Sequence, residues 1–195
     1  MHEQGKAAQR RKNDARFTQR YLVGVGIDVG AGPDPFSKYM DLFPHVVGCR
    51  AWDMADGDGT YLEGIPDNSV DFVISSHCLE HLHWPEKALE NWVRVVRPGG
   101  YVIVTVPDWE MYERFTWPSR YGVGHIYAYT LNPTYYALDK ERVPLIFLPD
   151  LYRTATAPLD YLSVSLDHFD PSKGIDVDQS MGPAECAIEF VLRKV

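Results

Sequence analysis

Segments rich in apolar and β-branched residues alternate along the chain with polar turns, and four of these segments predict β-strands. They lie at residues 25–29, 45–50, 70–75 and 101–106. The run at 70–75 is apolar almost throughout, as expected of a strand in a parallel sheet that helices cover on both faces. A later run at 184–191 alternates enough to predict a final strand, and its pattern is compatible with an antiparallel orientation.

Two helices are predicted between these strands. Pro33 and Pro35 delay the first until residues 36–42, because proline does not fit a helix interior. The second begins at Pro85, a residue favoured in the first helical turn, and closes at the turn 98–100. Its apolar residues have the spacing of one buried helix face: Ala88, Leu89, Trp92, Val93 and Val96.

Strand, helix and strand in this order form a right-handed βαβ unit with parallel strands. The chain is therefore predicted to be one α/β domain over residues 1–195, a Rossmann-like three-layer sandwich with a mostly parallel sheet. Ligands of such sheets bind at the carboxyl ends of the strands. Three turns meet at this edge and predict one cleft: the glycine turn after Val29, residues 75–77 and residues 107–108.

Composition narrows the possible partners. The 195 residues carry a formal net charge of −8, which disfavours long nucleic-acid backbones and favours a small-molecule substrate. Cys49, Cys78 and Cys186 are far apart and odd in number, so we expect reduced, buried thiols and a cytoplasmic location. Because no apolar run approaches the roughly 20 residues of a membrane helix, and the first residues lack the apolar centre of a secretory signal, no membrane partner is expected.

The segment G-I-D-V-G-A-G-P at residues 26–33 joins a strand to a glycine turn. Gly30 and Gly32 permit backbone conformations that side chains forbid, and the exposed amides of such a turn can approach a nucleotide-like ligand. The segment resembles the G-x-D-x-G-x-G motif of class I S-adenosylmethionine-dependent methyltransferases. The resemblance implies that Gly30 and Gly32 line the methionine and ribose part of the cofactor, and that Asp28 orients the turn or the cofactor's amine.

Two later segments strengthen the resemblance, which covers residues 24–106. Residues 65–82 resemble the family's L-P-x-x-x-x-x-D-x-V-x-S-x-x-x-L-E-H run, and residues 93–104 resemble the helix end and strand that come after it. A full class I domain places a helix and a strand between the landmarks that here are Arg50 and Asp71. Since this interval is short, the middle of the sheet is predicted to be abbreviated.

The resemblance also implies nucleoside contacts. The family's acidic residue at the end of the second strand, which holds the ribose hydroxyls, falls at Arg50, so the sequence departs from the pattern there. Asp53 is the nearest replacement. Asp58 and Gly59 resemble the family's element that contacts the adenine ring. The same stretch also resembles a calcium-binding loop, but it lacks the glutamate that an EF-hand needs.

Ser76 or His77 is expected at the methionyl end of the cofactor. The basic residues of the lead, residues 1–20, either cover the cofactor's carboxylate or are solvated. We expect the solvated state, with the first part disordered. Four residues at close spacing suggest a metal site, but the resemblance already explains the Glu80-His81 element as a helix start, so no metal is predicted. These four are His77, Cys78, His81 and His83.

Methyl transfer from a sulfonium depends chiefly on alignment of the acceptor and exclusion of water. For a hydroxyl acceptor, His125 is the first candidate base, because imidazole titrates near neutral pH, and Asp108 is the second. A loop histidine without a catalytic role is the alternative for His125. Residues 109–178, interrupted by prolines, predict an irregular substrate lid whose aromatic residues form either an acceptor pocket or a satellite core. These are Tyr112, Trp117, Tyr121, Tyr127 and Tyr129.

Three functions are compatible with the sequence. The first is an S-adenosylmethionine-dependent methyltransferase that acts on a small molecule, such as a sugar or phenolic hydroxyl. The second is a noncatalytic module that binds the same cofactor, favoured by Arg50 and the shortened middle. The third is a nicotinamide-dependent oxidoreductase, suggested by the glycines at 24–26. Pro33 and Pro35 disfavour it, because they lie just after the turn, where a helix should meet a pyrophosphate.

Overall fold

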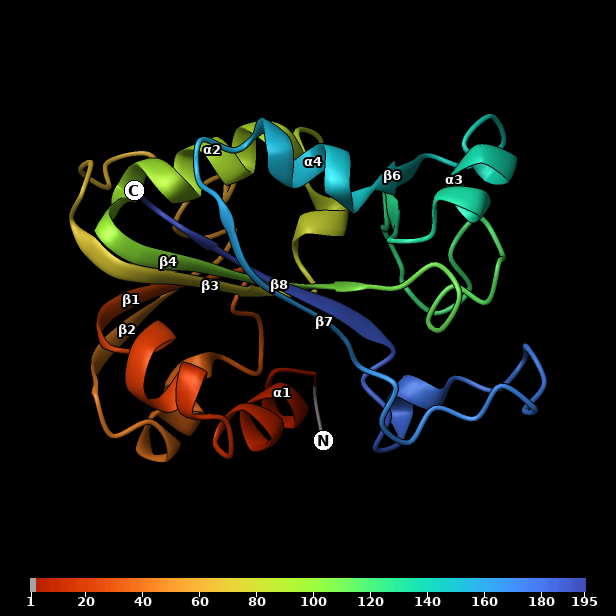
Figure 1. Ribbon diagram of the computed structural model, residues 1–195, viewed down its shortest axis with the longest axis horizontal. Helices are drawn as coiled ribbons and strands as arrows, with labels where there is room; N and C mark the ends of the chain where they lie inside the picture. The colour runs from red at the N-terminus through yellow and green to blue at the C-terminus, as the bar shows by residue number, and fades with distance from the viewer. Residues whose placement is uncertain (1–2) are drawn as a thin grey trace.

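The computed structural model describes residues 3–195, and its centre is a six-stranded sheet (Figure 1). The strands are β1 (Gly24–Val29), β2 (Val46–Trp52), β3 (Val70–Ser76), β4 (Val96–Pro107), β7 (Leu159–Val164) and β8 (Ala187–Arg193), in the order β2-β1-β3-β4-β8-β7. Strands β1 to β4 are parallel, whereas β8 is antiparallel to both β4 and β7. The predicted α/β fold, with a mostly parallel sheet and an antiparallel final strand, is confirmed.

Helices cover both faces of this sheet. Helix α2 (Pro85–Val95) packs beside α4 (Leu148–Thr154) on the upper face in Figure 1. The lower face carries α1 (Glu3–Arg11), the π-helix η1 (Phe17–Tyr21) and the 3-10 helix η2 (Phe36–Leu42). Neighbouring side chains of β3 alternate between the two cores, with Val73 on the α2 side and Phe72 and Ile74 on the α1 side. The predicted three-layer sandwich is therefore confirmed.

The interval between β2 and β3 is short, as predicted. Residues 53–69 contain neither a helix nor a strand, and β2 is consequently an edge strand of the sheet. The indole of Trp92 on α2 donates a hydrogen bond to the carbonyl of Gly59 at 2.8 Å, which ties this loop to the upper layer. The loop thus takes a defined position without a helix of its own.

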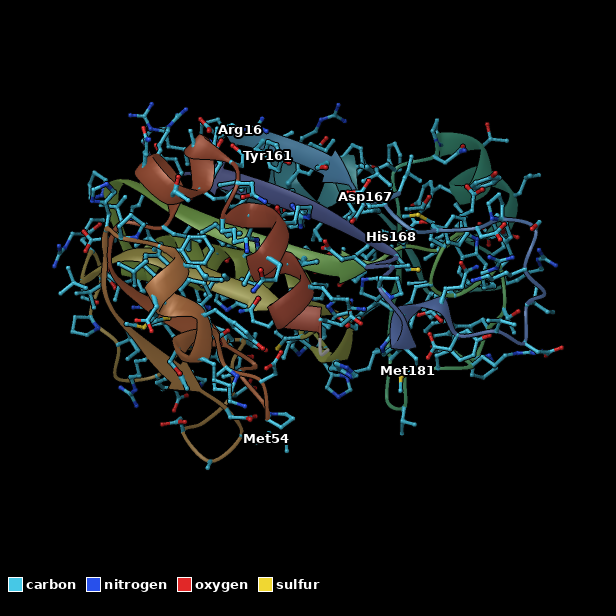
Figure 2. The ribbon with its side chains drawn as sticks, turned by 90° about the horizontal axis from the view of Figure 1, so that it is seen from below. Arg16, Met54, Tyr161, Asp167, His168 and Met181 are labelled. Carbon is cyan, nitrogen blue, oxygen red and sulfur yellow. The ribbon has the colours of Figure 1, made fainter. Side chains whose placement is uncertain are left out.

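The N-terminal lead differs from the expectation. Residues 3–11 form helix α1, and Arg11 is fully buried, so this part of the lead is neither disordered nor solvated. Arg11 donates from Nε to Glu189 Oε2 on β8 at 2.7 Å. The guanidinium of Arg16 lies over the ring of Tyr161 on β7, 4.4 Å from its centroid, where Figure 2 shows the two side chains together. The buried ion pair between Arg11 and Glu189 on β8 explains why this part of the lead folds against the sheet. A run of basic residues in the sequence does not show that an acidic partner exists elsewhere in the chain.

Residues 109–178 contain more regular structure than the predicted irregular lid. Besides α4 and β7, they hold α3 (Pro133–Asp139) and a small parallel sheet of β5 (Ala128–Thr130) and β6 (Leu145–Phe147). The prolines were expected to interrupt regular structure, yet Pro133 and Pro149 lie in the first turns of α3 and α4. Strand β7 completes the main sheet. The role of this segment as a substrate lid, and the assignment of one domain to residues 1–195, stay predictions.

Two expectations from composition concern membranes and thiols. In residues 3–195 every helix is too short or too polar to cross a bilayer. All three cysteines are free, as predicted, but only Cys186 is buried, and Cys49 and Cys78 are half-buried.

Candidate active site

The carboxyl ends of β1, β2 and β3 border two adjoining cavities that share Gly30 and His77. The large cavity, of about 580 Å³, is lined by the residues that come after β2, together with Cys78, His81 and Leu82. The small cavity, of about 300 Å³, is lined by the glycine turn, by Ser76 and by the first turn of α1. All residues predicted to contact the cofactor line one or both cavities: Asp28, Gly30, Gly32, Asp53, Asp58, Gly59, Ser76 and His77.

The glycine turn has the backbone that its sequence requires. Gly30 and Gly32 have φ of +73° and +51°, a region that side chains disfavour. A Cβ on Gly30 would lie 2.4 Å from both Cβ and Sγ of Cys78, so the turn also approaches the end of β3 too closely for any other residue. Asp28 is 2% exposed, and its carboxylate accepts a hydrogen bond from the amide of Phe36 at 2.7 Å. Burial raises the pKa of Asp28 to about 6. This carboxylate fixes the path of the chain after the turn.

Asp53 is the first residue after β2, because the strand extends to Trp52 and not only to Arg50. The carboxylate of Asp53 accepts from the amide of Gly32 at 3.1 Å and from the amide of Met54 at 2.8 Å. Arg50 lies within the strand, exposed, with its guanidinium over the ring of Trp52. The apparent departure from the family pattern thus came from a strand end placed too early, and an acidic residue does follow β2.

The loop at Asp58 and Gly59 forms another wall of the large cavity. Asp58 is exposed, and its Oδ1 accepts from the amide of Thr60 at 2.8 Å. A Cβ on Gly59 would lie 3.0 Å from a methyl group of Val29, so the loop lies close against the end of β1. The hydrogen bond from Thr60 therefore holds the exposed carboxylate at the wall of the cavity.

His77 lies where the two cavities meet and has a φ of +53°. Its amide donates to the carbonyl of Thr105 at 3.0 Å, and its Nδ1 lies 3.2 Å from the hydroxyl of Ser76. Burial lowers the pKa of His77 to about 3, so the ring is neutral. Its Nε2 is buried without a hydrogen-bond partner among residues 3–195, which leaves one polar atom available to a ligand.

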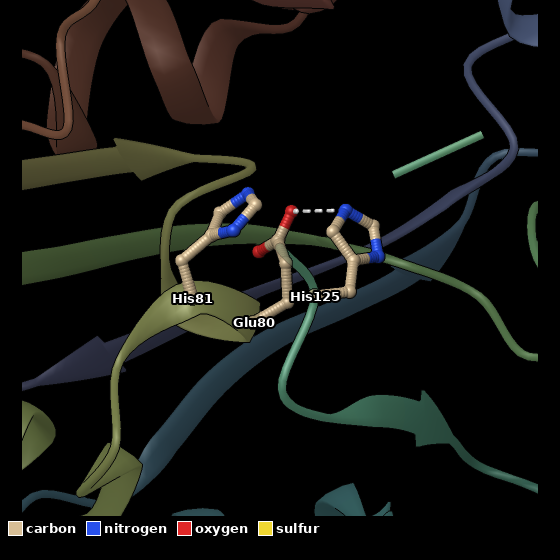
Figure 3. Close-up of side chains that lie close together, drawn as sticks. All are labelled: Glu80, His81 and His125. Carbon is tan, nitrogen blue, oxygen red and sulfur yellow. Dashed lines mark ion pairs between the residues drawn. The ribbon is translucent and has the colours of Figure 1, made fainter. Parts of the chain in front are cut away.

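His125 belongs to a cluster at the edge of the large cavity, with Glu80 and His81 (Figure 3). The amides of Ile126 and Tyr127 donate to the carbonyl of Glu80 at 2.8 and 3.2 Å, which pins the loop that carries His125 to the segment after β3. A Cβ on Gly122 would lie 2.1 Å from the His125 ring. Glycine at this position therefore lets the backbone pack directly against the ring.

The side chain of His125 is only 4% exposed and is held from both sides of the ring. Its Nδ1 lies 2.7 Å from Oε1 of Glu113, its Nε2 lies 3.8 Å from Oε1 of Glu80, and Tyr112 stacks on it with ring centroids 5.6 Å apart. Burial alone would lower the pKa of His125, but the bond to Glu113 and the charges of Glu80 and Glu113 raise it. Burial raises the pKa of Glu80 to about 7.

Asp108, the second candidate base, lines a separate cavity with Met111 and Tyr135 and lies outside both cavities at the strand ends. Its Oδ1 accepts from the amides of Glu110 and Met111, at 3.0 and 2.9 Å. Burial raises the pKa of Asp108 to about 6. The carboxylate therefore closes a turn after β4, and the structure does not bring it to His125.

The five aromatic residues singled out in 109–178 line neither cavity at the strand ends, and most of them pack within the protein. Tyr129 is wholly buried and donates to the carbonyl of Leu79 at 3.1 Å, and Trp117 packs against a satellite core around Trp109. Tyr127 packs against the main core. Tyr121 donates to a backbone carbonyl in the loop at residue 175. Only Tyr112 of the five stacks on the His125 ring.

Glu80 and Glu113 were not predicted as site residues. Both side chains are fully buried, and three of their four carboxylate oxygens have no hydrogen-bond partner in the described part of the chain. The L-E-H segment was the available signal for Glu80. Nothing in the sequence around Glu113 marks it, because its contact with His125 depends on how the intervening loop folds back.

Comparisons with known proteins show which proteins this chain is similar to. Residues 27–104 match the methyltransferase domain family. The chain is 33% identical over 100 residues to a protein of Mycolicibacterium gilvum described as an uncharacterized methyltransferase, a match that covers 43% of this chain and 39% of the relative. The chain thus spans about two fifths of the length of the curated relatives it matches.

Solved structures share the fold over almost the whole chain. Phosphoethanolamine N-methyltransferase 2 of Haemonchus contortus, solved in complex with S-adenosylmethionine, has a TM-score of 0.54 and 14% identity, with coverage of 95% of this chain and 52% of that one. The [4+2]-cyclase SpnF has a TM-score of 0.51 and 17% identity, with coverage of 96% and 80%. At these identities the likeness shows the fold alone, and the cyclase shows that the fold also serves other chemistry.

The order of the strands and the cleft at the glycine turn are those of the class I S-adenosylmethionine-dependent methyltransferase fold. Residues 27–104 match the methyltransferase domain family, and S-adenosylmethionine is the cofactor of this class. The resemblance inferred from the glycine turn and the L-E-H segment is confirmed.

Proposed function

We propose that this chain transfers a methyl group from S-adenosylmethionine to a hydroxyl group of a small molecule, such as a sugar or a phenol. The observation that supports the proposal is that the predicted cofactor residues and the candidate base lie side by side in one site. The glycine turn, the residues after β2 and the end of β3 surround two adjoining cavities, and a buried imidazole held by two carboxylates lies beside them.

The cavities fit the cofactor. The large cavity has a volume within the roughly 300–1,000 Å³ of small-molecule sites, and Trp52 and Leu82 give it apolar walls for a nucleobase. Asp53 would hold the ribose hydroxyls, and Asp58 with the amide of Gly59 would hold the adenine ring. The small cavity would take the amino-acid tail, for which the unpartnered Nε2 of His77 supplies a polar contact.

When bound, S-adenosylmethionine supplies a methyl group on a sulfonium, and the acceptor oxygen gains that group as S-adenosylhomocysteine is released. The acceptor's proton must leave in the same reaction. His125 is suited to receive it at Nε2. In the neutral ring the short contact with Glu113 favours a proton on Nδ1 and leaves the Nε2 lone pair free, and the raised pKa of His125 makes this nitrogen a stronger base. The stacked ring of Tyr112 shields this imidazole from water.

The test has two parts. Calorimetric titration should detect one S-adenosylmethionine per chain, and a panel of phenols and sugars should accept a labelled methyl group from it. His125→Ala should keep cofactor binding and lower kcat by about 10²- to 10⁴-fold, the range for a general base. His83→Ala, which changes an exposed histidine outside the cluster, is the matched control. Failure to bind the cofactor would overturn the proposal, and binding without transfer to any acceptor would favour the noncatalytic module.

The structure weakens the arguments for the other two functions. The noncatalytic module rested partly on Arg50, but Asp53 follows β2 and lines the large cavity. The oxidoreductase needs a helix that begins at the glycine turn. Here Pro33 and Pro35 precede a short 3-10 helix that starts only at Phe36.

A further inference from the structure

We propose that Glu80, His81 and His125 bind a divalent transition-metal ion at the edge of the large cavity (Figure 3). No metal was predicted from the sequence. His77, Cys78, His81 and His83 are close in the chain, whereas the group that the fold assembles takes one ligand from a distant loop. Binding of the ion stands on these residues alone, and only its role in the reaction rests on the proposed function.

The donor set is that of a metal site with open positions. Two imidazoles and one carboxylate bind zinc in catalytic sites and iron(II) in oxygenases, and in both cases at least one position is left for water or substrate. Both oxygens of the buried Glu80 carboxylate lack a hydrogen-bond partner among residues 3–195. A buried carboxylate without partners is costly, and a cation would satisfy it.

His125 is held as a metal ligand usually is. Ligating histidines commonly donate their second ring nitrogen to a carboxylate, which fixes the tautomer and the ring orientation. Here Nδ1 of His125 lies 2.7 Å from Glu113 Oε1, and Nε2 faces Glu80 Oε1 at 3.8 Å. The backbone bonds from residues 126 and 127 to the Glu80 carbonyl keep the two ligands at this distance.

The spacing suits one ion after a small adjustment. The three ligand atoms lie within 4.8 Å of one another. Tetrahedral ligands bound at about 2.1 Å would be about 3.4 Å apart, so one side chain must move slightly inward. His81 is exposed, and its side chain makes one hydrogen bond, between Nδ1 and the Gly124 carbonyl at 3.0 Å, and one edge-to-face contact with the His125 ring, so it can make this movement at little cost.

His81 also lines the large cavity, so the ion would lie beside the proposed cofactor site. An acceptor hydroxyl that binds the ion would lose its proton to solvent more readily, since a divalent ion lowers the pKa of a coordinated oxygen. In that case Nε2 of His125 is a ligand and does not act as the base. The ion favours acceptors with a second oxygen next to the reacting hydroxyl, which could bind the ion as well.

The experiment titrates Zn²⁺ into chelator-treated protein by calorimetry, and repeats the measurement with Co²⁺, whose visible absorption reports coordination by nitrogen and oxygen. We expect one ion per chain. His81→Ala is the first variant because the side chain is exposed, and it should weaken Zn²⁺ binding at least as much as Glu113→Gln, for which loss of an orienting carboxylate predicts about 10- to 100-fold. His83→Ala, which changes a nearby histidine outside the cluster, should leave the affinity unchanged.

The proposal is overturned if wild-type protein takes up neither ion, or if His81→Ala and His83→Ala bind Zn²⁺ alike. Glu80→Gln, which keeps the shape of the buried side chain, should also weaken binding while its unfolding temperature without metal confirms that it folds. S-adenosylmethionine affinity is measured on the same samples. Protein that binds the cofactor but no ion would reject the metal site alone, and protein that binds the ion but no cofactor would reject the proposed function alone.

Discussion

Glu189 on β8 holds helix α1 against the sheet, and we predict that Glu189→Gln destabilises the protein by about 3–5 kcal/mol. The residue is 2% exposed. It accepts from Nη1 of Arg10 at 2.9 Å, from Nε of Arg11 at 2.7 Å and from the hydroxyl of Thr105 at 3.2 Å. Glutamine keeps the shape of the side chain but leaves the fully buried Arg11 guanidinium without a counter-charge, which is the costly way to break a buried ion pair.

Guanidinium chloride denaturation at pH 7, followed by tryptophan fluorescence, measures this loss. In a chain of this length about 2–4 °C of Tm accompany each kcal/mol, so Tm should fall by about 6–20 °C. The matched control is Asp14→Asn, which removes the exposed ion pair with Arg16 and should cost at most about 1 kcal/mol. If Glu189→Gln were no more harmful than this control, the buried network would not stabilise the fold as we argue.

The pH dependence of the same pair provides a second test. Burial opposes ionisation of Glu189, but the charges of Arg11 and Arg10 outweigh it and lower its pKa in the folded state. The ionised carboxylate therefore stabilises the fold fully above the unfolded pKa of about 4.3, and this contribution is lost as the pH falls through the lower folded pKa. The difference in unfolding free energy between wild type and Glu189→Gln should shrink below about pH 4.

Two further predictions concern the cofactor. Asp58→Ala should weaken S-adenosylmethionine binding by about 1–3 kcal/mol, or about 5- to 150-fold, if a hydrogen bond to the adenine is lost. An unchanged Kd by calorimetry would refute this role, and Asp41→Ala serves as the control because Asp41 is exposed on η2 and lines neither cavity. Gly30→Ala should abolish cofactor binding and lower Tm, because the new Cβ would lie 2.4 Å from Cys78 and the φ of Gly30 is +73°. Adding Cys78→Gly to this variant should restore part of the lost Tm. If Tm were not restored, the clash with Cys78 would not be the cause.

The parts of the fold with a local signal could be predicted from the sequence. The apolar run that became β3, and the proline and apolar spacing of α2, depend on neighbours within a few residues, so the start of each was right to within a residue or two. The end of β2 had no such signal. Because it was placed at Arg50, the acidic residue that follows the strand seemed displaced, although Asp53 lies directly after Trp52.

Contacts between distant segments could not be predicted. Nothing near Arg11 indicates that Glu189 would neutralise it, and the basic lead was therefore expected to be solvated. The cluster of Glu80 with His125 likewise depends on backbone bonds between two loops. His125 was identified as a candidate by its chemistry, but its partners Glu80 and Glu113 depend on tertiary structure alone.

The short loop between β2 and β3 has a consequence for the choice of chemical probes. This loop replaces an entire helix and strand beside the proposed nucleobase site, and Met54 on it is 92% exposed. A dye or affinity handle attached to the base edge of a cofactor analogue would therefore leave the large cavity past the exposed side chain of Met54, whereas the same handle on the amino-acid tail would collide with helix α1.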